Sequence, residues 1–590
     1  MEPQKGTRAT KGAGGHKNTF VLLVPFCGFR LRWAQVYALF LSFCLVHTGC
    51  FNEKPSTYYG TIVPPRAQEF RWSDGGLPQT FDPAFAAAPP DTDAVRALFE
   101  GLTDYDPQTL APVPAVATRW ESSHDGRVWT FYLRDNARWS NGEKVTAADF
   151  VRSWQRTLKI GPLAPHTELL ANIEGATAST PQAESPAQPQ SPESPQSRES
   201  SRSAASPSPT PTPFGAEAIN DHVLQVTLQH ADNSFPALVA HPVFRPVKLP
   251  DADHTKPIES HDLISNGAFQ LSATEADRVR LERARTYWDG DSVSLDRVTF
   301  VNTANPEDAL SAYRDGDVDA VTNAAFEPLA LKLLAPYKDF RRSTFGALTY
   351  YVFNVDREPF DDVRVREALA LAIDRERVSR DDLGGATEPA GRFLPDAMSG
   401  EKPVVGKTEL LDHDINKARE LLVEAGYPDG DGFPVIRLLI NRNEQQRIVA
   451  QAIAAMWRAA LNIETEIVIK GWDEYEAAIK TGDYDVVRRG LVMQTTSETT
   501  NIAMLFGRDS HTSPVQPMEG PAQAATPEPQ RPALIETEAQ ALKELKAMPI
   551  YFASSYSLVK PYVSGFDLNV LDAPSLKRTR LDTNWKEQAR

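Results

Sequence analysis

The chain has 590 residues, of which 41% are hydrophobic and 24% are charged, the balance of an ordinary water-soluble protein. This composition excludes a wholly disordered chain, a collagen and a polytopic membrane protein, and the length leaves room for several domains. The formal net charge is −16, and binding phosphate requires a basic surface, so we expect no nucleic acid among its partners.

Residues 1–49 have the layout of an export signal. A basic stretch at 1–32 precedes an apolar run at 33–46, which is shorter than the ~20 residues of a membrane span. Small residues stand directly before Cys50, an arrangement that resembles the lipobox of bacterial lipoproteins, whose cysteine is acylated and becomes the first residue of the mature protein. We predict a lipoprotein signal peptide at 1–49 and lipidation of Cys50, which would anchor the exported protein at the periplasmic or cell-surface face of a membrane. A plain signal peptide or a membrane anchor is the alternative.

The mature body contains no cysteine, because the three in the chain are Cys27, Cys44 and Cys50. It therefore holds no internal disulfide, cysteine metal site or thiol nucleophile. Removing residues 1–49 takes away six positive charges and one negative charge, which changes the net charge from −16 to −21. Since so acidic a body is repelled by anionic lipid, we expect the lipid at Cys50 to be its only attachment to a membrane.

Short strands alternate with amphipathic helices along the chain. The predicted strands are 128–133, 223–228, 298–301 and 464–469, and the predicted helices are 147–157, 362–380, one that ends at Gly426 before a turn at 428–432, and 447–461. In the helix at 362–380, the residues expected to face inward are Val363, Ala368, Leu371 and Ala372. This mixed order of strands and helices predicts α/β lobes.

Two segments have the composition of loops. Residues 181–213 contain nine Pro and nine Ser and no large apolar residue, so this stretch cannot offset the entropy of ordering it. We predict a disordered surface insert over 180–213 and a Pro-rich loop over 508–532.

Motifs of catalysis are missing from the sequence. It contains no complete Gly-rich phosphate loop, no His-Glu-x-x-His and no Gly-x-Ser-x-Gly, and its eleven histidines show no pair at metal-ligand spacing. The acidic turns at 289–291 and 429–431 lack the ligand spacing of a calcium loop. We therefore expect no catalytic residue, no metal and no cofactor, and we do not expect an enzyme.

About a dozen short motifs occur in a fixed order over residues 69–175 and 216–565. They include Leu98-Phe-Glu-Gly-Leu102, Asp125-Gly-Arg-Val-Trp129, Ser265-Asn-Gly-Ala-Phe269, Pro359-Phe-Asp-Asp-Val363 and Thr481-Gly-Asp-Tyr-Asp485. No single motif is specific, but the ordered set resembles the extracytoplasmic solute-binding proteins of family 5, which include the oligopeptide- and dipeptide-binding proteins of ABC importers.

The resemblance implies an α/β fold of the periplasmic-binding-protein type II kind, with two α/β lobes around a cleft plus an extra lobe. The implied divisions are a tether at 50–68, lobe I at 69–97, 216–325 and 556–590, the extra lobe at 98–215, and lobe III at 326–555. The lobes of such a protein close about a hinge and enclose the ligand, and the closed state is what a permease recognises.

The resemblance also implies a function without chemistry. A small peptide is captured in the cleft and handed unaltered to an inner-membrane ABC permease. We expect a monomer, attached to the membrane through its lipid alone.

In the family, an Arg after the Gly-Asp-Tyr-Asp turn can meet a peptide carboxylate, and an Asp shortly after it meets the peptide amine. Here Arg488 matches the Arg, Leu491 replaces a Trp, and Gln494 replaces the Asp. The ligand-binding residues that the resemblance implies are Trp472, Arg488, Gly490, Leu491, Val492 and Gln494. A neutral Gln cannot neutralise an ammonium, and Glu498 could substitute for the Asp only if the loop shifts.

These assignments leave alternatives open. Trp472 could be a core residue on a strand-to-helix turn, and Arg488 could be a structural ion-pair partner. Tyr551, Phe552 and Tyr556 are expected in the core rather than in the cleft.

Because of Gln494, the ligand could also be a capped or modified peptide, or another small solute such as a metal chelate, haem or a glycoside. A different class of function, a surface interaction lipoprotein without a transport role, also remains open at this point.

Overall fold

The computed structural model describes residues 57–176, 213–249, 254–398, 411–507, 535 and 537–587. The predicted signal peptide, Cys50, nearly all of the Pro/Ser insert and the whole Pro-rich loop lie outside these residues. The described residues belong to one unit, Thr57–Arg590.

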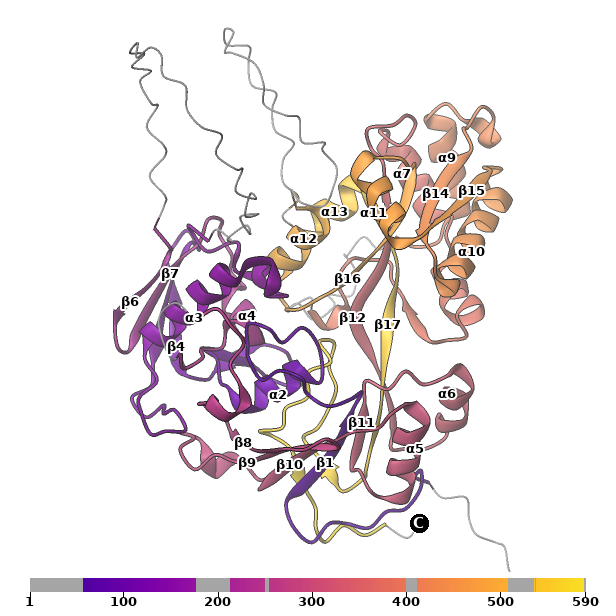
Figure 1. Ribbon diagram of the computed structural model, residues 1–590. Coiled ribbons are helices and arrows are strands. Elements are labelled where there is room, and N and C mark those ends of the chain that lie inside the picture. Colours follow the sequence, from indigo (N-terminus) through magenta and orange to yellow (C-terminus); the bar gives the residue numbers. More distant parts are fainter. Residues whose placement is uncertain are drawn as a thin grey trace, which may run out of the picture. The chain divides into compact units, whose positions relative to one another are not determined.

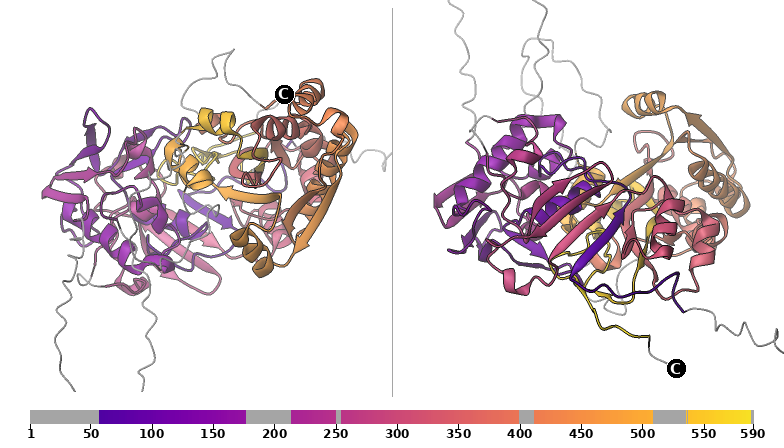
Figure 2. Two further views of the ribbon diagram at one scale, coloured as in Figure 1. Left: turned by 90° about the horizontal axis from the view of Figure 1, so that it is seen from above. Right: turned by 60° about the horizontal axis from the view of Figure 1, so that its bottom comes forward.

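Eleven strands of the described residues form one mixed sheet (Figure 1). Its order is β15-β14-β16-β12-β17-β11-β1-β10-β9-β8, and β13 pairs with β17 off this path. The bounds are β1 (Glu69–Asp74), β8 (Phe269–Thr274), β9 (Arg278–Arg283), β10 (Arg297–Val301), β11 (Ala320–Thr322), β12 (Phe340–Phe353), β13 (Thr387–Pro389), β14 (Ile436–Asn441), β15 (Thr465–Lys470), β16 (Val486–Val492) and β17 (Ala547–Val559). In the right view of Figure 2, the indigo strand β1 lies beside strands from the middle of the chain, and it pairs in parallel with β10 and β11.

Two long strands, β12 and β17, join the two halves of this sheet. At its end β17 pairs with β11 through Leu558 and Val559, while β12 pairs with β17 on one side and with β16 on the other. The register of β12 on β17 shifts between Thr344 and Leu348. Such an irregularity bends a strand locally. The two halves of the sheet are therefore linked through strands whose pairing is irregular at this point.

A separate four-stranded sheet has the order β4-β5-β7-β6. Its bounds are β4 (Ala117–Ser122), β5 (Val128–Leu133), β6 (Ala216–Asn220) and β7 (Val223–Thr227). Since β6 and β7 pair in the same sheet as β5, residues 216–227 belong with the extra lobe. The predicted boundary after residue 215 is therefore placed too early. Two small pairs complete the strands: β2 (Thr103–Tyr105) with β3 (Pro112–Pro114), and β18 (Val563–Ser564) with β19 (Arg580–Leu581).

The two sides of the predicted Pro/Ser insert are tied together by backbone hydrogen bonds. Glu174 N–H donates to the carbonyl of Thr227 (2.9 Å), and Gly215 N–H donates to the carbonyl of Glu174 (2.7 Å). The chain therefore leaves and re-enters the sheet at neighbouring points.

Helices flank both sheets. They are α2 (Asp91–Leu98), α3 (Ala147–Ile160), α4 (Phe235–Leu238), α5 (Pro306–Asp315), α6 (Pro328–Leu334), α7 (Val363–Leu371), α8 (Arg375–Arg377), α9 (Ile415–Glu424), α10 (Glu444–Leu461), α11 (Trp472–Thr481), α12 (Glu498–Phe506) and α13 (Glu538–Glu544). Single turns of tighter or wider helix lie at Gly161–Leu163, Thr167–Leu170, Pro242–Phe244, Ser260–Asp262, Gly290–Ser292, Val378–Asp382, Asp396–Met398 and Pro428–Gly430. Local sequence explains several ends: Thr146 and Asp149 form a capping box on α3, and Asn443 caps α10.

Most predicted elements are confirmed within a few residues, but the helix at 362–380 is wrong as a single helix. The chain leaves the helix after α7 and restarts at α8, because the side chain of Asp374 accepts the N–H of Arg377 (2.9 Å) and so forms a new N-cap. Val363, expected to face inward, is exposed, whereas Ala368, Leu371 and Ala372 are buried.

One buried ion pair fixes the segment after β1 to helix α3. Asp82 and Arg156 are both fully buried, and the two carboxylate oxygens accept Nη1 (2.9 Å) and Nη2 (2.6 Å). The same carboxylate accepts the backbone N–H groups of Ala84 and Ile258, both at 3.0 Å. All of its acceptor capacity is therefore used inside the protein.

Asp82→Ala should destabilise the protein by about 3–5 kcal/mol, because it leaves the guanidinium of Arg156 buried without a counter-charge. The free energy of urea unfolding measures this loss. As a control, Glu121→Ala removes the partner of Arg119 in an exposed pair and should change stability by no more than experimental error. Equal losses of stability in the two variants would contradict the conclusion that the buried pair of Asp82 and Arg156 stabilises the fold.

Candidate functional site

Three of the predicted ligand-binding residues share one face of β16. Side chains alternate along a strand, so Arg488, Gly490 and Val492 lie on the same side. That side changes from fully buried at Val486 to exposed at Gly490 and Val492. The strand thus emerges from the core along the face that carries these residues.

The side chain of Leu491 points to the other side of β16. It packs with Met493 against the apolar cluster that contains Leu348, Phe393 and Phe552. The structure shows Leu491 in a packing contact with this cluster. Its role in ligand binding stays a prediction.

The guanidinium of Arg488 lacks a carboxylate partner within the described ranges. Its Nη2 lies 3.3 Å from Thr349 Oγ1, and its buried Nε makes no hydrogen bond. The neighbouring Arg489 differs, because it forms an ion pair with Glu476 at 3.3 Å. Among the described residues, Arg489 therefore forms a structural ion pair and Arg488 does not, which argues against the alternative role of Arg488 as an ion-pair partner.

Trp472 begins α11, directly after β15, so the predicted strand-to-helix turn is confirmed. The alternative of a core residue is wrong, because the side chain is 63% exposed at the helix N-terminus. Its ring lies 5.7 Å from that of Tyr475, whose hydroxyl donates to the carbonyl of Arg488. Trp472 is thus connected to β16 through one intervening side chain.

Gln494 lies in the turn between β16 and α12. Its side chain contacts the buried imidazole of His241. Further along the turn, the hydroxyls of Ser497 and Ser234 are 2.7 Å apart, so the turn packs against residues 234–241. Glu498 does not take the place of the missing acid, because its Oε1 accepts the N–H of Glu538 at 2.8 Å.

The imidazole beside Gln494 is uncharged, and the side chains of Arg96 and Arg245 lie near it. Burial lowers the pKa of His241 well below its usual value, and the nearby His166 and Arg96 lower it further. His241 Nδ1 accepts the N–H of Val243 (3.2 Å), so the neutral ring carries its proton on Nε2. Gln494 therefore stands beside an uncharged ring, which supplies no compensating charge for an ammonium.

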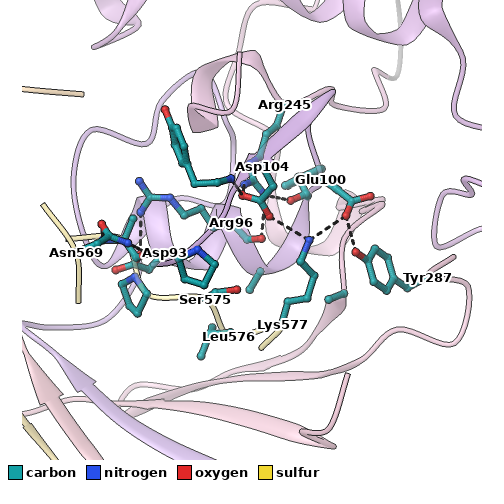
Figure 3. Close-up of a pocket in the computed structure, with 17 residues that line it drawn as sticks. Asp93, Arg96, Glu100, Asp104, Arg245, Tyr287, Asn569, Ser575, Leu576 and Lys577 are labelled. Carbon is teal, nitrogen blue, oxygen red and sulfur yellow. Dashed lines mark hydrogen bonds and ion pairs between the residues drawn. The ribbon is translucent and has the colours of Figure 1, made fainter. Parts of the chain in front are cut away.

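A polar pocket lies next to this region (Figure 3). It is lined by α2, the segment after it and the C-terminal stretch 569–577, and its charged residues are Asp93, Arg96, Glu100, Asp104, Arg245 and Lys577. Three basic and three acidic side chains therefore line the pocket.

Lys577 joins the charges of this pocket. Its Nζ lies 3.3 Å from Glu100 Oε1 and 3.1 Å from Asp104 Oδ2. Burial alone would raise the pKa of Asp104, but Lys577 and Arg245 outweigh it and hold that pKa below its usual value. Burial alone would lower the pKa of Lys577, and Asp104 with Glu100 raises it. Sequence patterns could not predict this network, because Lys577 stands 477 residues after Glu100.

Three buried carboxyl groups, those of Asp74, Asp93 and Asp572, lie close to this pocket. The carboxyl groups of Asp74 and Asp93 lie close enough to affect each other's pKa, and the Oδ2 atom of each is buried without another partner. Burial raises the pKa of Asp74 to about 6 and that of Asp572 to about 6. Burial and the neighbouring Asp74 raise the pKa of Asp93 well above its usual value. Two carboxyl groups in contact require a shared proton, so this cluster favours protonation.

One further expectation concerns packing. Tyr551 and Phe552 are buried as expected. Tyr556 is only half-buried, and its ring stacks on that of Phe340 with the centroids 5.7 Å apart, so its expected place in the core is wrong.

In the described part of the chain, no group of three or more His, Cys, Asp or Glu side chains could hold a metal ion, and no helix is long and apolar enough to cross a membrane.

Comparison with known proteins places the chain in a family. Residues 111–513 match the model of the bacterial extracellular solute-binding proteins, family 5. The chain belongs to this family, whose members are binding proteins of transport systems rather than enzymes.

Two similar relatives come from Escherichia coli (strain K12). The periplasmic murein peptide-binding protein MppA is 30% identical over 520 residues, which cover 85% of this chain and 91% of MppA. The periplasmic oligopeptide-binding protein OppA is 29% identical over 513 residues, which cover 84% of this chain and 89% of OppA. Both relatives are periplasmic, which supports the predicted export of this chain.

Solved structures agree with the predicted fold. The unliganded open form of MppA has a TM-score of 0.69 at 27% identity and covers 88% of this chain and 98% of its own. Haemophilus influenzae OppA in complex with RPPGFSPFR has a TM-score of 0.56 at 25% identity and covers 88% and 99%. The predicted α/β fold of periplasmic-binding-protein type II is confirmed.

Asp74→Asn should show how much the carboxyl cluster contributes to the pH dependence of the unfolding free energy, apart from all other titrating groups. Because its folded pKa is raised, Asp74 stabilises the fold in full below its unfolded pKa of about 4, and this contribution is lost as the pH rises through about 6. Asn does not titrate and can still accept from Thr322 and Asn323. Between about pH 5 and pH 7.5, the variant should gain on the order of 1 kcal/mol relative to wild type in urea unfolding. Parallel pH profiles for the two proteins would contradict this account.

Proposed function

We propose that this chain is the lipid-anchored substrate-binding subunit of an ABC importer, capturing oligopeptides in an interlobe cleft and delivering them to an inner-membrane permease. The similarity to two peptide-binding relatives supports the peptide ligand. The small residues before Cys50 support the anchor.

An open strand edge carries the proposal. β14 pairs with β16 only at Val486 and Val487, whereas β12 pairs with β16 as far as Val492. Within the described ranges, the edge of β16 that faces away from β12 has no neighbouring strand from Arg488 to Val492. Backbone groups on such an edge can pair with the extended main chain of a peptide whatever its side chains are.

The unpaired guanidinium of Arg488 lies on this same stretch. A partly buried cation without a counter-ion is a favourable partner for a carboxylate, because a charged hydrogen bond offsets the cost of its desolvation. We assign Arg488 to a carboxylate of the ligand, with Gly490 leaving room beside it: an added Cβ at Gly490 would come within 3.1 Å of the guanidinium.

The neutral pair of Gln494 and His241 favours a second candidate within the same class of protein. A ligand whose end lacks an ammonium, such as a blocked peptide or a non-peptide solute, would suit these two uncharged groups better than a free amine. Under either candidate, the protein releases its ligand unaltered.

Arg488→Ala should weaken binding of peptides with a free C-terminal carboxylate by about 1.5–3 kcal/mol, roughly ten- to hundred-fold in Kd. Titration calorimetry with matched free-acid and C-terminally amidated peptides measures this effect. The amidated peptides should bind wild type and variant alike. Arg489→Ala is the matched control, because this residue faces the other side of the strand and is paired with Glu476. An equal loss for both peptide forms would remove the assignment, and no heat from any peptide would remove the peptide ligand itself.

Gln494→Asp should tighten binding of peptides with a free N-terminal amine by about tenfold, because it supplies the missing counter-charge for an ammonium. Gln494→Asn is the control, since Asn has the size of Asp without its charge. N-acetylated peptides should bind all three proteins equally. If Asp and Asn behave alike, the ligand's amine does not reach this turn.

A further inference from the structure

Helix α6 turns apolar side chains to the solvent. Leu329 is 68% exposed and Leu333 is 64% exposed, and residues four apart lie on the same face of a helix. Leu334 alone is buried, in the cluster around Tyr313. Two neighbouring leucines at this exposure form an apolar surface that the fold itself does not use.

Other residues of the same segment are also exposed. We use the name α6 face for the exposed residues of 325–338, which are Ala325, Glu327, Pro328, Leu329, Lys332, Leu333, Ala335, Pro336 and Lys338. These residues carry two lysines and one glutamate, a net charge of +1, whereas the chain from Cys50 onward has a net charge of −21. The α6 face thus exposes two large apolar side chains, and its net charge has the opposite sign to that of the whole mature chain.

The start of the described chain lies beside this face. Lys338 N–H donates to the carbonyl of Thr57 (3.0 Å). The ring of Tyr59 meets that of Tyr337 edge-on at 5.3 Å, and Tyr59 N–H donates to Asp339 at 2.9 Å. Lys560 holds the next residues, with Nζ 2.8 Å from the carbonyl of Thr61. The segment is therefore fixed to the body at the C-terminal end of α6.

Cys50 stands only seven residues before Thr57. A fully extended chain of this length spans at most about 25 Å. If Cys50 carries a lipid, its position in the membrane keeps Thr57 within that distance of the bilayer, and Thr57 lies beside Lys338 at the end of the α6 face.

We propose that the α6 face lies on the lipid bilayer to which Cys50 holds the chain. The inference rests on the proposed lipid anchor. It goes beyond that anchor, because the folded body itself would contact the membrane in addition to the lipid at Cys50. Leu329 and Leu333 would enter the boundary between headgroups and acyl chains, while Lys332 and Lys338 would reach lipid phosphates with their ammonium groups. The acidic remainder of the body would stay away from anionic lipid.

A single-cysteine design tests the contact in the mature lipoprotein. The body has no cysteine after Cys50, and acylation removes the thiol of Cys50 itself. Leu333→Cys, and separately Leu329→Cys, can therefore be labelled with a polarity-sensitive NBD fluorophore. Leu163→Cys is the matched control, because Leu163 is an exposed leucine (75%) in the extra lobe, far along the sequence from the tether. Each protein is reconstituted into vesicles of equal parts phosphatidylcholine and phosphatidylglycerol.

In the vesicles, the labels at 329 and 333 should shift to the blue and be quenched by a nitroxide-bearing lipid, while the label at 163 responds only to aqueous iodide. Equal iodide quenching at all three positions would overturn the proposal. A blue shift without vesicles at high protein concentration would overturn it in favour of a second copy of the chain. Protection that occurs only in native membranes, and not in pure lipid, would overturn it in favour of a membrane protein partner.

The mass of the mature protein distinguishes the failure of the anchor from the failure of the contact. A diacylated N-terminus with exposed labels would overturn the membrane contact alone. An unmodified N-terminus, seen also as a second label on Cys50, would overturn the anchor and the contact together, and it would leave peptide binding untouched.

Discussion

The pairing of β12 with β17 connects the two halves of the main sheet and so determines where the site can be. β17 reaches β11 at one end and runs beside β12 along most of its length, and β12 in turn holds β16. The face of β16 that carries Arg488 is therefore positioned by β12, which is joined to the other half of the sheet through β17. The register shift near Gly346 lies within this link, where a change of bend would move β16 without breaking its own pairing.

Buried cations in the described part of the chain are compensated in two ways. Arg156 and Lys577 are paired with carboxylates. Arg366, Arg375 and Lys560 form no ion pair there and donate to backbone carbonyl oxygens instead. Arg488 differs from both groups, because its guanidinium has only the hydroxyl of Thr349 at hydrogen-bond distance and its buried Nε has no partner. Since burial without compensation costs free energy, this guanidinium is the one that a ligand carboxylate would stabilise most.

Sequence patterns predict an element correctly where short-range interactions determine it. The strand at 128–133 and the helix beginning at 147 follow from alternation, apolar periodicity and a capping box. Periodicity predicts one helix over 362–380 and misses the break, because it does not register the cap at Asp374. It also leaves Trp472 open as a core residue, because the sequence does not show how exposed an aromatic side chain is at the start of a helix. The link between Glu100 and Lys577, and the contact of Gln494 with His241, depend on chain segments that only the tertiary fold brings together.

The hydrogen bonds that tie Glu174 to both Thr227 and Gly215 have a consequence for the engineering of this chain. A segment whose two roots are already joined can change in length or composition without altering the distance it must bridge, and each doubling of its length costs only about 0.6 kcal/mol in closure entropy. A long proline- and serine-rich stretch is therefore compatible with the sheet at this point. The same root pair is a natural place to splice in a reporter domain that would leave the binding strands undisturbed.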